Sequence, residues 1–182
     1  MNNTLKYLVP AFVLGCWMAC GKAKQQRVSP ANSGRSEADM REALIHQNKD
    51  LINEEIEAIQ AFTDRRGWQM DTTSTGLRFS IREQTSGRPA RLMKDVTISF
   101  TASLLNGTLC YSSDSSGTLT FTLGQSDLPS GLQEGILKMK EGEKALIIVP
   151  SYLAYGISGD GICIPGSSSI LYEVKLEKVS EQ

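Results

Sequence analysis

The chain has 182 residues, of which 40% are hydrophobic and 21% are charged, and its formal net charge is −1. This length accommodates one ordinary domain with appended segments, and the composition is that of a folded globular protein rather than a disordered one. A net charge so close to zero gives no long-range attraction to nucleic acid, so we expect no nucleic-acid partner.

The first twenty residues have the composition of an export signal. An early lysine is followed by an apolar run too short for a comfortable membrane span, and then by Ala19-Cys20-Gly21, which resembles a bacterial lipobox. We therefore predict a lipoprotein signal peptide at 1–19, lipidation of Cys20 and a location in the cell envelope, periplasmic or at the outer membrane. Cys16 is an alternative lipidation site, and a secretory signal without lipid is an alternative to both. Each alternative leaves the mature protein where disulfides can persist.

A flexible tether and a long helix are expected next. Residues 20–35 lack apolar periodicity and are rich in Lys, Gln, Ser and Gly. Ser36, with Asp39 three residues later, has the form of a capping box, and apolar residues then recur at three- and four-residue steps. This pattern predicts a helix at 36–66 within an N-terminal helical region at 36–75. Its apolar face must cover either the following domain or a second copy of the helix.

The hydrophobic period changes from helical to two in the rest of the chain, which predicts a β-rich domain at 76–182. Asn106-Gly107 between two apolar runs is a strong signal for a two-residue hairpin turn. The segment 130–139 has apolar residues in helical register and predicts one short helix. A mostly antiparallel sheet with one short helix is an α+β domain. The five predicted strands lie at 77–84, 96–103, 119–123, 144–149 and 170–179.

Several kinds of catalytic chemistry have no residues to support them. His46 is the only histidine, and because it lies among polar neighbours in the predicted helix we expect it to face solvent rather than to act as a ligand or base. The sequence has no Cys-x-x-Cys, no histidine pair and no phosphate-binding glycine loop. We therefore expect neither a metal nor a cofactor. An enzyme built on this sequence would belong to the narrow class that uses neither a strong base nor a metal.

A series of motifs between Asp95 and Val179 has a recognisable order. It comprises Leu-Gly at 123–124, Gly-Leu-Gln-Glu-Gly at 131–135, Val-Pro-Ser at 149–151, Ala-Tyr-Gly at 154–156 and Ile-Pro at 164–165. Together these motifs resemble the FKBP-type peptidyl-prolyl cis-trans isomerases. The resemblance implies a twisted antiparallel half-barrel of about five strands around one short helix, here preceded by a long N-terminal helix. With the leader and Arg-Arg-Gly-Trp at 65–68, the chain resembles the gliding-motility type of FKBP lipoprotein.

The resemblance also implies a functional site. The loop at 153–165 would form one wall of an apolar pocket that receives a prolyl side chain of a polypeptide client. Tyr155 would donate its hydroxyl to a substrate carbonyl, and Phe100 and Phe121 would complete the catalytic set. Without the resemblance, we would interpret each of these apolar residues as part of the ordinary hydrophobic core. The substrate-binding residues would be Leu119, Leu128, Leu132, Ile164 and Tyr172.

Such a pocket suits prolyl isomerisation. Rotation about an X-Pro bond breaks amide resonance, with a barrier of about 20 kcal/mol and a timescale of tens to hundreds of seconds. The twisted amide is less polar than the planar one, so an apolar pocket favours it. Stabilising the transition state by about 4 kcal/mol accelerates the reaction roughly a thousandfold without any nucleophile.

Some positions depart from the family pattern. Where the family often has an aromatic residue followed by aspartate, this chain has Cys110 and Tyr111, so we expect the site to lack that carboxylate. A backbone N–H that binds ligand falls on Pro129, which has none, unless the register shifts by one residue. Leu132 replaces an aromatic pocket floor. Besides an active folding enzyme, these departures leave open a low-activity chaperone or binding module for prolyl segments. An envelope lipoprotein assembled through its helix is a third alternative.

The family layout also implies a disulfide and a homodimer. Cys110 and Cys163 border the implied pocket from opposite sides, and they remain once the leader and the lipidated residue are set aside. We hypothesise that they form a disulfide, and two separate buried thiols are the alternative. Family members with N-terminal helices often dimerise through them, so a homodimer through this helix is also expected.

Overall fold

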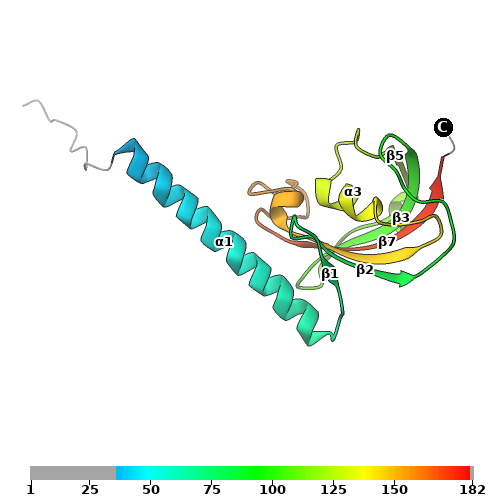
Figure 1. Cartoon of the computed structure of the whole chain (residues 1–182), viewed down its shortest axis with the longest axis horizontal. Coiled ribbons are helices and arrows are strands. Elements are labelled where there is room, and N and C mark those ends of the chain that lie inside the picture. The colour runs from blue at the N-terminus through cyan, green and yellow to red at the C-terminus, as the bar shows by residue number, and fades with distance from the viewer. Residues whose placement is uncertain (1–35, 181–182) are drawn as a thin grey trace, which may run out of the picture. The chain divides into compact units, whose positions relative to one another are not determined.

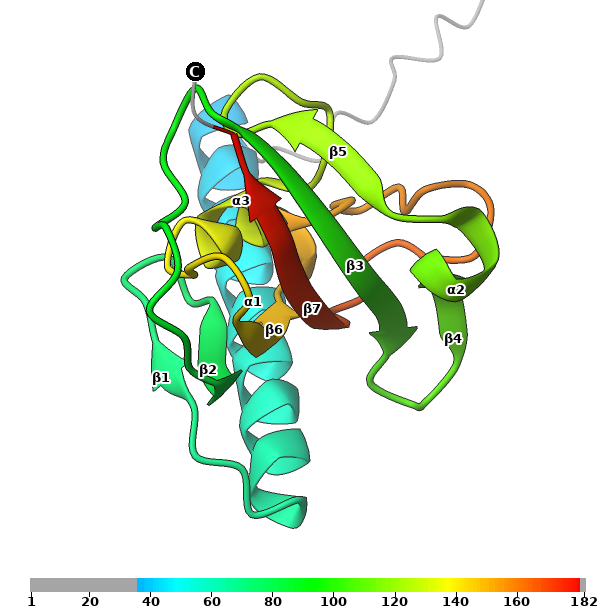
Figure 2. The ribbon, with the colours of Figure 1, turned by 90° about the vertical axis from the view of Figure 1, so that its right-hand side faces the viewer.

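The computed structural model describes residues 36–180, and its centre is one antiparallel sheet with the strand order β1-β2-β6-β7-β3-β4, in which β5 also pairs with β3 (Figure 1). The turned view in Figure 2 shows β7, β3 and β5 side by side, as their registers require. The strands are β1 Asp71–Thr72, β2 Arg78–Glu83, β3 Asp95–Leu104, β4 Leu109–Ser112, β5 Leu119–Thr122, β6 Lys144–Val149 and β7 Ile170–Val179. The helices are α1 Glu37–Arg65, α2 Ser113–Ser116, α3 Ser130–Ile136 and the 3-10 helix η1 Ser151–Leu153.

Helix α3 packs closely on β6 and carries part of the main core. Leu132 and Ile136 are fully buried, and the helix approaches the sheet at glycines. A Cβ on Gly131 would lie 2.5 Å from Cγ1 of Val149, so only glycine allows this distance. The expected α+β architecture, an antiparallel sheet with one short helix against it, is therefore confirmed.

Strand β6 is buried on both faces, which explains its unbroken apolar run. Alternate residues of the strand point in opposite directions. Ala145, Ile147 and Val149 join the main core, whereas Leu146 and Ile148 belong to a second cluster with residues of α1. This second cluster holds Ile59, Phe62, Leu146, Ile148 and Leu171, with Trp68, Met70 and Leu105 packed against it.

Helix α1 begins with the predicted capping box. Ser36 N donates to Asp39 Oδ2 and Asp39 N donates to Ser36 Oγ, each at 3.1 Å. From Arg41 onward the chain forms one compact unit, so most of α1 belongs to the same unit as the sheet. His46 is exposed, as expected. Within residues 36–180, no helix combines the length and the apolar content that a membrane crossing requires.

The differences from the predicted elements are short segments. Strand β1 has two residues and falls inside the region expected to be helical, and α2 was not predicted, whereas β4 is the short second strand of the hairpin expected at Asn106-Gly107. Such short elements carry too few residues for a periodic pattern. The predicted signal peptide at 1–19, lipidation at Cys20 or Cys16, and the tether at 20–35 lie outside the described residues.

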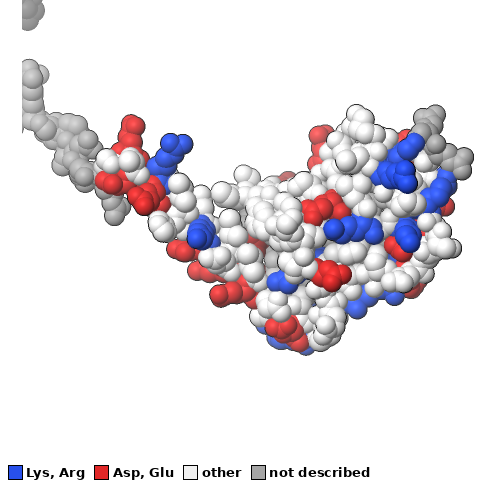
Figure 3. Space-filling view, in the orientation of Figure 1, with Lys and Arg blue, Asp and Glu red and all other residues white. Residues whose placement is uncertain are grey.

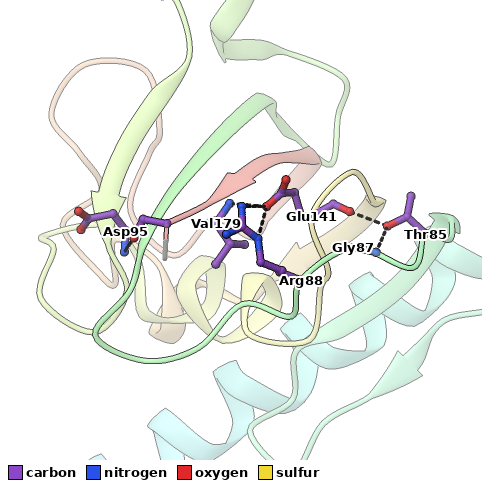
Figure 4. A network of polar contacts seen from close by, with 7 residues as sticks. Thr85, Gly87, Arg88, Asp95, Glu141 and Val179 are labelled. Carbon is purple, nitrogen blue, oxygen red and sulfur yellow. Dashed lines mark hydrogen bonds and ion pairs between the residues drawn. The ribbon is translucent and has the colours of Figure 1, made fainter. Parts of the chain in front are cut away.

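A polar network closes the sheet at the end of β7 (Figure 4). The Glu141 carboxylate accepts from Val179 N at 3.0 Å and pairs with Arg88 at 3.0 Å. Thr85 donates to the Glu141 carbonyl at 2.5 Å and accepts from Gly87 N at 3.3 Å. Charges of both signs are intermixed on the face shown in Figure 3, in keeping with the net charge of −1.

Candidate functional site

The predicted site residues come from β3, β5, β7, α3 and the loops between them. Phe100 lies on β3, Leu119 and Phe121 lie on β5, and Leu132 lies on α3. Seven of the eight belong to the main core cluster or pack against it, and the exception is the Leu128 side chain. Leu128 contributes a carbonyl that accepts from Gln133 Nε2 at 2.8 Å. Seven of these eight side chains thus belong to one continuous apolar cluster formed by the sheet, α3 and the loops.

The eight candidate side chains divide into three buried ones, which we call the floor, and five partly exposed ones, which we call the wall. Leu132, Ile164 and Tyr172 are 1%, 2% and 3% exposed. The wall residues are only partly buried, so they present apolar surface to solvent instead of being sealed in the interior. Such a surface can receive a small apolar ring. The wall residues are Phe100, Leu119, Phe121, Leu128 and Tyr155.

Two tyrosines place a hydroxyl at this apolar surface. Tyr172 on β7 lies close enough to Tyr155 for the second tyrosine to raise its pKa, and the Tyr172 ring centroid lies 6.3 Å from that of Phe100. Burial is the largest cause that raises the pKa of both tyrosines. A phenolic O–H such as that of Tyr155 can donate to an acceptor on a ligand.

A carboxylate that the sequence analysis did not find organises the loop. Asp160 Oδ1 accepts from the backbone N–H groups of Ile162, Cys163 and Ile164 at 2.9, 3.0 and 2.8 Å. Its other oxygen accepts from the Tyr111 hydroxyl. The Tyr111 hydrogen bond is the main cause that lowers the pKa of Asp160 to about 2, and it raises the pKa of Tyr111 to about 12.

The carboxylate that the family often has after the Asn-Gly turn is absent here, and a carboxylate from another part of the chain contacts that position instead. Position 111 carries a tyrosine, but Asp160 reaches it from the loop, and its charge also raises the pKa of Tyr155 and Tyr172. The pair Asp160-Gly161 could have predicted that this carboxylate organises the turn. In turns, an aspartate side chain commonly accepts hydrogen bonds from backbone N–H groups a few residues ahead.

The predicted disulfide is present. Cys110 on β4 and Cys163 in the loop are bonded, with Cα atoms 5.6 Å apart. The Tyr111–Asp160 hydrogen bond lies next to this bridge, so the loop is held to β4 by two neighbouring links. Tyr111 pairs with Ala102 of β3, and the loop is thereby tied to the main sheet.

The glycines of the loop permit a fold in which the backbone packs on itself. Gly159 has φ +70°, and a Cβ there would lie 2.2 Å from the Ile164 carbonyl oxygen. Asp160 N donates to that same oxygen at 3.0 Å. Two isoleucines of the loop project into solvent, because Ile157 and Ile162 are 84% and 87% exposed. A groove of about 680 Å³ between α1 and this loop contains none of the eight candidate site residues.

Comparison with known proteins settles the family. The profile of the FKBP-type peptidyl-prolyl cis-trans isomerases matches residues 87–177, which is half of the chain. The chain belongs to this family. The FK506-binding protein of Neisseria meningitidis serogroup B is 38% identical over 107 residues, covering 58% of this chain and 98% of that protein.

Further FKBP relatives agree. The probable FKBP-type peptidyl-prolyl cis-trans isomerase FkpA of the same organism is 35% identical over 109 residues, covering 59% of this chain and 39% of that protein. Among solved structures, FkpA from Escherichia coli has a TM-score of 0.63 at 24% identity, covering 81% of this chain and 74% of that one. AtFKBP13 has a TM-score of 0.58 at 26% identity, and the match covers 62% of this chain and 100% of that one. The FKBP-like fold is thus confirmed.

One departure from the FKBP pattern persists in the structure. Pro129 is buried and precedes the first residue of α3, with φ −47° and ψ 130°. It has no N–H to offer at this position. Leu132, by contrast, fills the floor of the site as a buried aliphatic side chain.

Proposed function

We propose that this FKBP-type isomerase is lipid-anchored in the cell envelope and assists the folding of exported proteins. Two observations support the location. The first twenty residues have the order of a lipoprotein leader, and the chain carries a disulfide, which persists mainly in oxidising compartments. The lipid on Cys20 would supply the contact with the membrane.

Labelling with a palmitate analogue in bacterial cells tests the anchor. The wild type should be labelled, Cys20→Ser should not, and Cys16→Ser is the matched control that should keep its label. Loss of label in Cys16→Ser alone would place the lipid on Cys16. An unlabelled wild type would contradict lipid anchoring.

We assign the catalytic roles from the apolar surface with a hydroxyl at its edge. A proline ring of the client rests on the floor of Leu132 and Ile164, and the Tyr155 O–H donates to a client carbonyl. The surrounding rings replace water, which favours the twisted and less polar amide over the planar one. The observation that carries this assignment is that Tyr155 and the partly exposed rings pack against the buried cluster that contains Leu132 and Ile164.

Proline-limited refolding of a test protein measures this activity. A catalytic amount of the wild type should accelerate the slow phase, whereas Tyr155→Phe and Phe121→Ala should accelerate it several-fold less. Tyr152→Phe is the matched control, because the Tyr152 hydroxyl bonds the Thr75 carbonyl at 2.8 Å, away from the site. A slow phase that the wild type leaves unchanged at a stoichiometric amount would contradict the folding role.

Pro129 favours a second candidate function, a chaperone or binding module for prolyl segments with low turnover. Without a backbone N–H at that position, a bound carbonyl has one donor fewer. This alternative predicts that the protein suppresses aggregation of an unfolded client as well in the Tyr155→Phe variant as in the wild type. The isomerase role predicts instead that refolding rates separate the two proteins.

We also propose that α1 joins two copies of the chain. Its exposed apolar residues before Ile59 would be covered in a dimer. Leu44→Glu and Leu51→Glu should shift a dimer to a monomer in sedimentation equilibrium, while Asn53→Glu on the opposite side of the helix should not. A monomeric wild type would contradict the proposal. The exposed apolar residues are Met40, Leu44, Ile45, Leu51, Ile52 and Ile56.

A further inference from the structure

A glutamate of α1 contacts both ends of the segment that carries Tyr155. Glu55 accepts hydrogen bonds from Ser151 N at 2.7 Å and from Ser151 Oγ at 2.8 Å. Its Oε1 also accepts from the Ser169 hydroxyl. Ser151 begins η1 and Ser169 directly precedes β7, so one carboxylate holds the entry and the exit of the segment 151–169.

Ser151 is connected to Tyr155 by backbone hydrogen bonds. The Ser151 carbonyl accepts from Ala154 N at 3.0 Å and from Gly156 N at 2.8 Å, which are the residues on either side of Tyr155. The Gly156 carbonyl in turn accepts from Ser167 N at 2.8 Å. The position of Ser151 therefore determines where the Tyr155 backbone lies.

Glu55 is presented from a fixed part of α1. Residues 55, 59 and 62 are separated by steps of four and three, so they share one face of the helix. Ile59 and Phe62 are fully buried against β6 and the start of β7. Ser169 is itself buried, and without Glu55 its hydroxyl would lose this partner. Both partners of the contact are therefore fixed in place, Glu55 by the buried face of α1 and Ser169 by its own burial.

We infer that Glu55 is a positioning residue for Tyr155. Through this residue, the N-terminal helix contributes to the isomerase activity. The inference rests on the proposed role of Tyr155. Without Glu55, Ser151 and Ser169 lose the shared acceptor that keeps the two ends of the segment together, and the Tyr155 hydroxyl is less well placed over the client amide. Small displacements of a positioned group reduce catalysis strongly.

The test compares Glu55→Ala with Glu57→Ala in the full chain. Glu57 is an exposed residue of the same helix. With a short X-Pro peptide substrate, kcat/KM of Glu55→Ala should fall roughly tenfold, mainly through kcat, and that of Glu57→Ala should stay at the wild-type value. In a Tyr155→Phe background, Glu55→Ala should change kcat/KM less than twofold, because the hydroxyl it positions is absent. Circular dichroism at the assay temperature checks that each variant is folded.

Amide hydrogen exchange supplies a readout that does not depend on activity. The Gly156 amide should exchange at least tenfold faster in Glu55→Ala than in the wild type or in Glu57→Ala. Unchanged exchange at Gly156, or an undiminished effect of Glu55→Ala in the Tyr155→Phe background, would overturn the inference alone. A Tyr155→Phe variant as active as the wild type would instead overturn the proposed role of Tyr155, and with it the catalytic part of this inference.

Discussion

Tyr111 donates its hydroxyl proton to a hydrogen bond with Asp160, directly beside the disulfide between Cys110 and Cys163. Two consecutive residues of β4 thus bind two residues of the loop that borders the candidate site. One link is covalent and the other depends on the ionisation of a carboxylate. Redox conditions and pH should therefore act separately on the same loop.

Reduction of the disulfide should destabilise the whole domain. The bond closes a loop with a sequence separation of 53, for which the chain-entropy relation gives about 4 kcal/mol. We expect urea unfolding of the reduced protein to show a free energy of unfolding lower by up to this amount. The Cys110→Ser/Cys163→Ser double variant is the control, and reductant should not change its unfolding curve. A wild-type curve that reductant leaves unchanged would contradict the prediction.

Acid should weaken the loop through Asp160. The pKa of Asp160 is about 2 in the folded protein, below the ordinary value of 3.8. The folded state therefore stabilises the ionised carboxylate relative to the unfolded state. This contribution is fully present above about pH 4 and is lost as the pH falls toward 2. Between those values the wild type should lose more stability in urea unfolding than Asp160→Asn. Asp127→Asn, in an exposed part of the loop before α3, should behave like the wild type. Parallel losses in the wild type and Asp160→Asn would rule out this linkage.

Much of the fold follows from local patterns in the sequence. Strands β3, β6 and β7 were placed within one residue of their observed ends, β3 and β7 from their alternating pattern and β6 from its continuous apolar run. The capping box at Ser36 is local as well. Strand β1 could not be predicted in this way, because two exposed residues contain no alternation.

The candidate site was only partly predictable for a related reason. Its apolar members were found through motifs that are contiguous in the chain, and the disulfide through the positions of two cysteines in the family layout. The contact of Asp160 with Tyr111 spans 49 residues, and that of Glu55 with Ser151 spans 96. Contacts of this kind depend on how separate elements meet in three dimensions, and no local pattern encodes them.

Addition of one methyl group at Gly131 should be destabilising. In an exposed helix, Gly→Ala is stabilising by up to about 1 kcal/mol. Here the new Cβ would lie 2.5 Å from Cγ1 of Val149, which is fully buried and rigid at χ1. We therefore expect Gly131→Ala to cost about 1–3 kcal/mol of the free energy of unfolding. In the Val149→Ala background the same substitution should cost less, and an equal cost in both backgrounds would exclude this steric cause.

Tyr172→Phe should reduce isomerase activity while keeping the packing of β7. The substitution removes the hydroxyl that lies close to Tyr155 and retains the ring that packs near Phe100. Without this polar neighbour, the Tyr155 hydroxyl should point less often toward the client carbonyl, and kcat/KM for an X-Pro peptide should fall roughly three- to tenfold. In a Tyr155→Phe background, Tyr172→Phe should have little further effect. If the two substitutions instead multiply their effects, Tyr172 acts independently of Tyr155, and the orientation of Tyr155 must come from the loop alone.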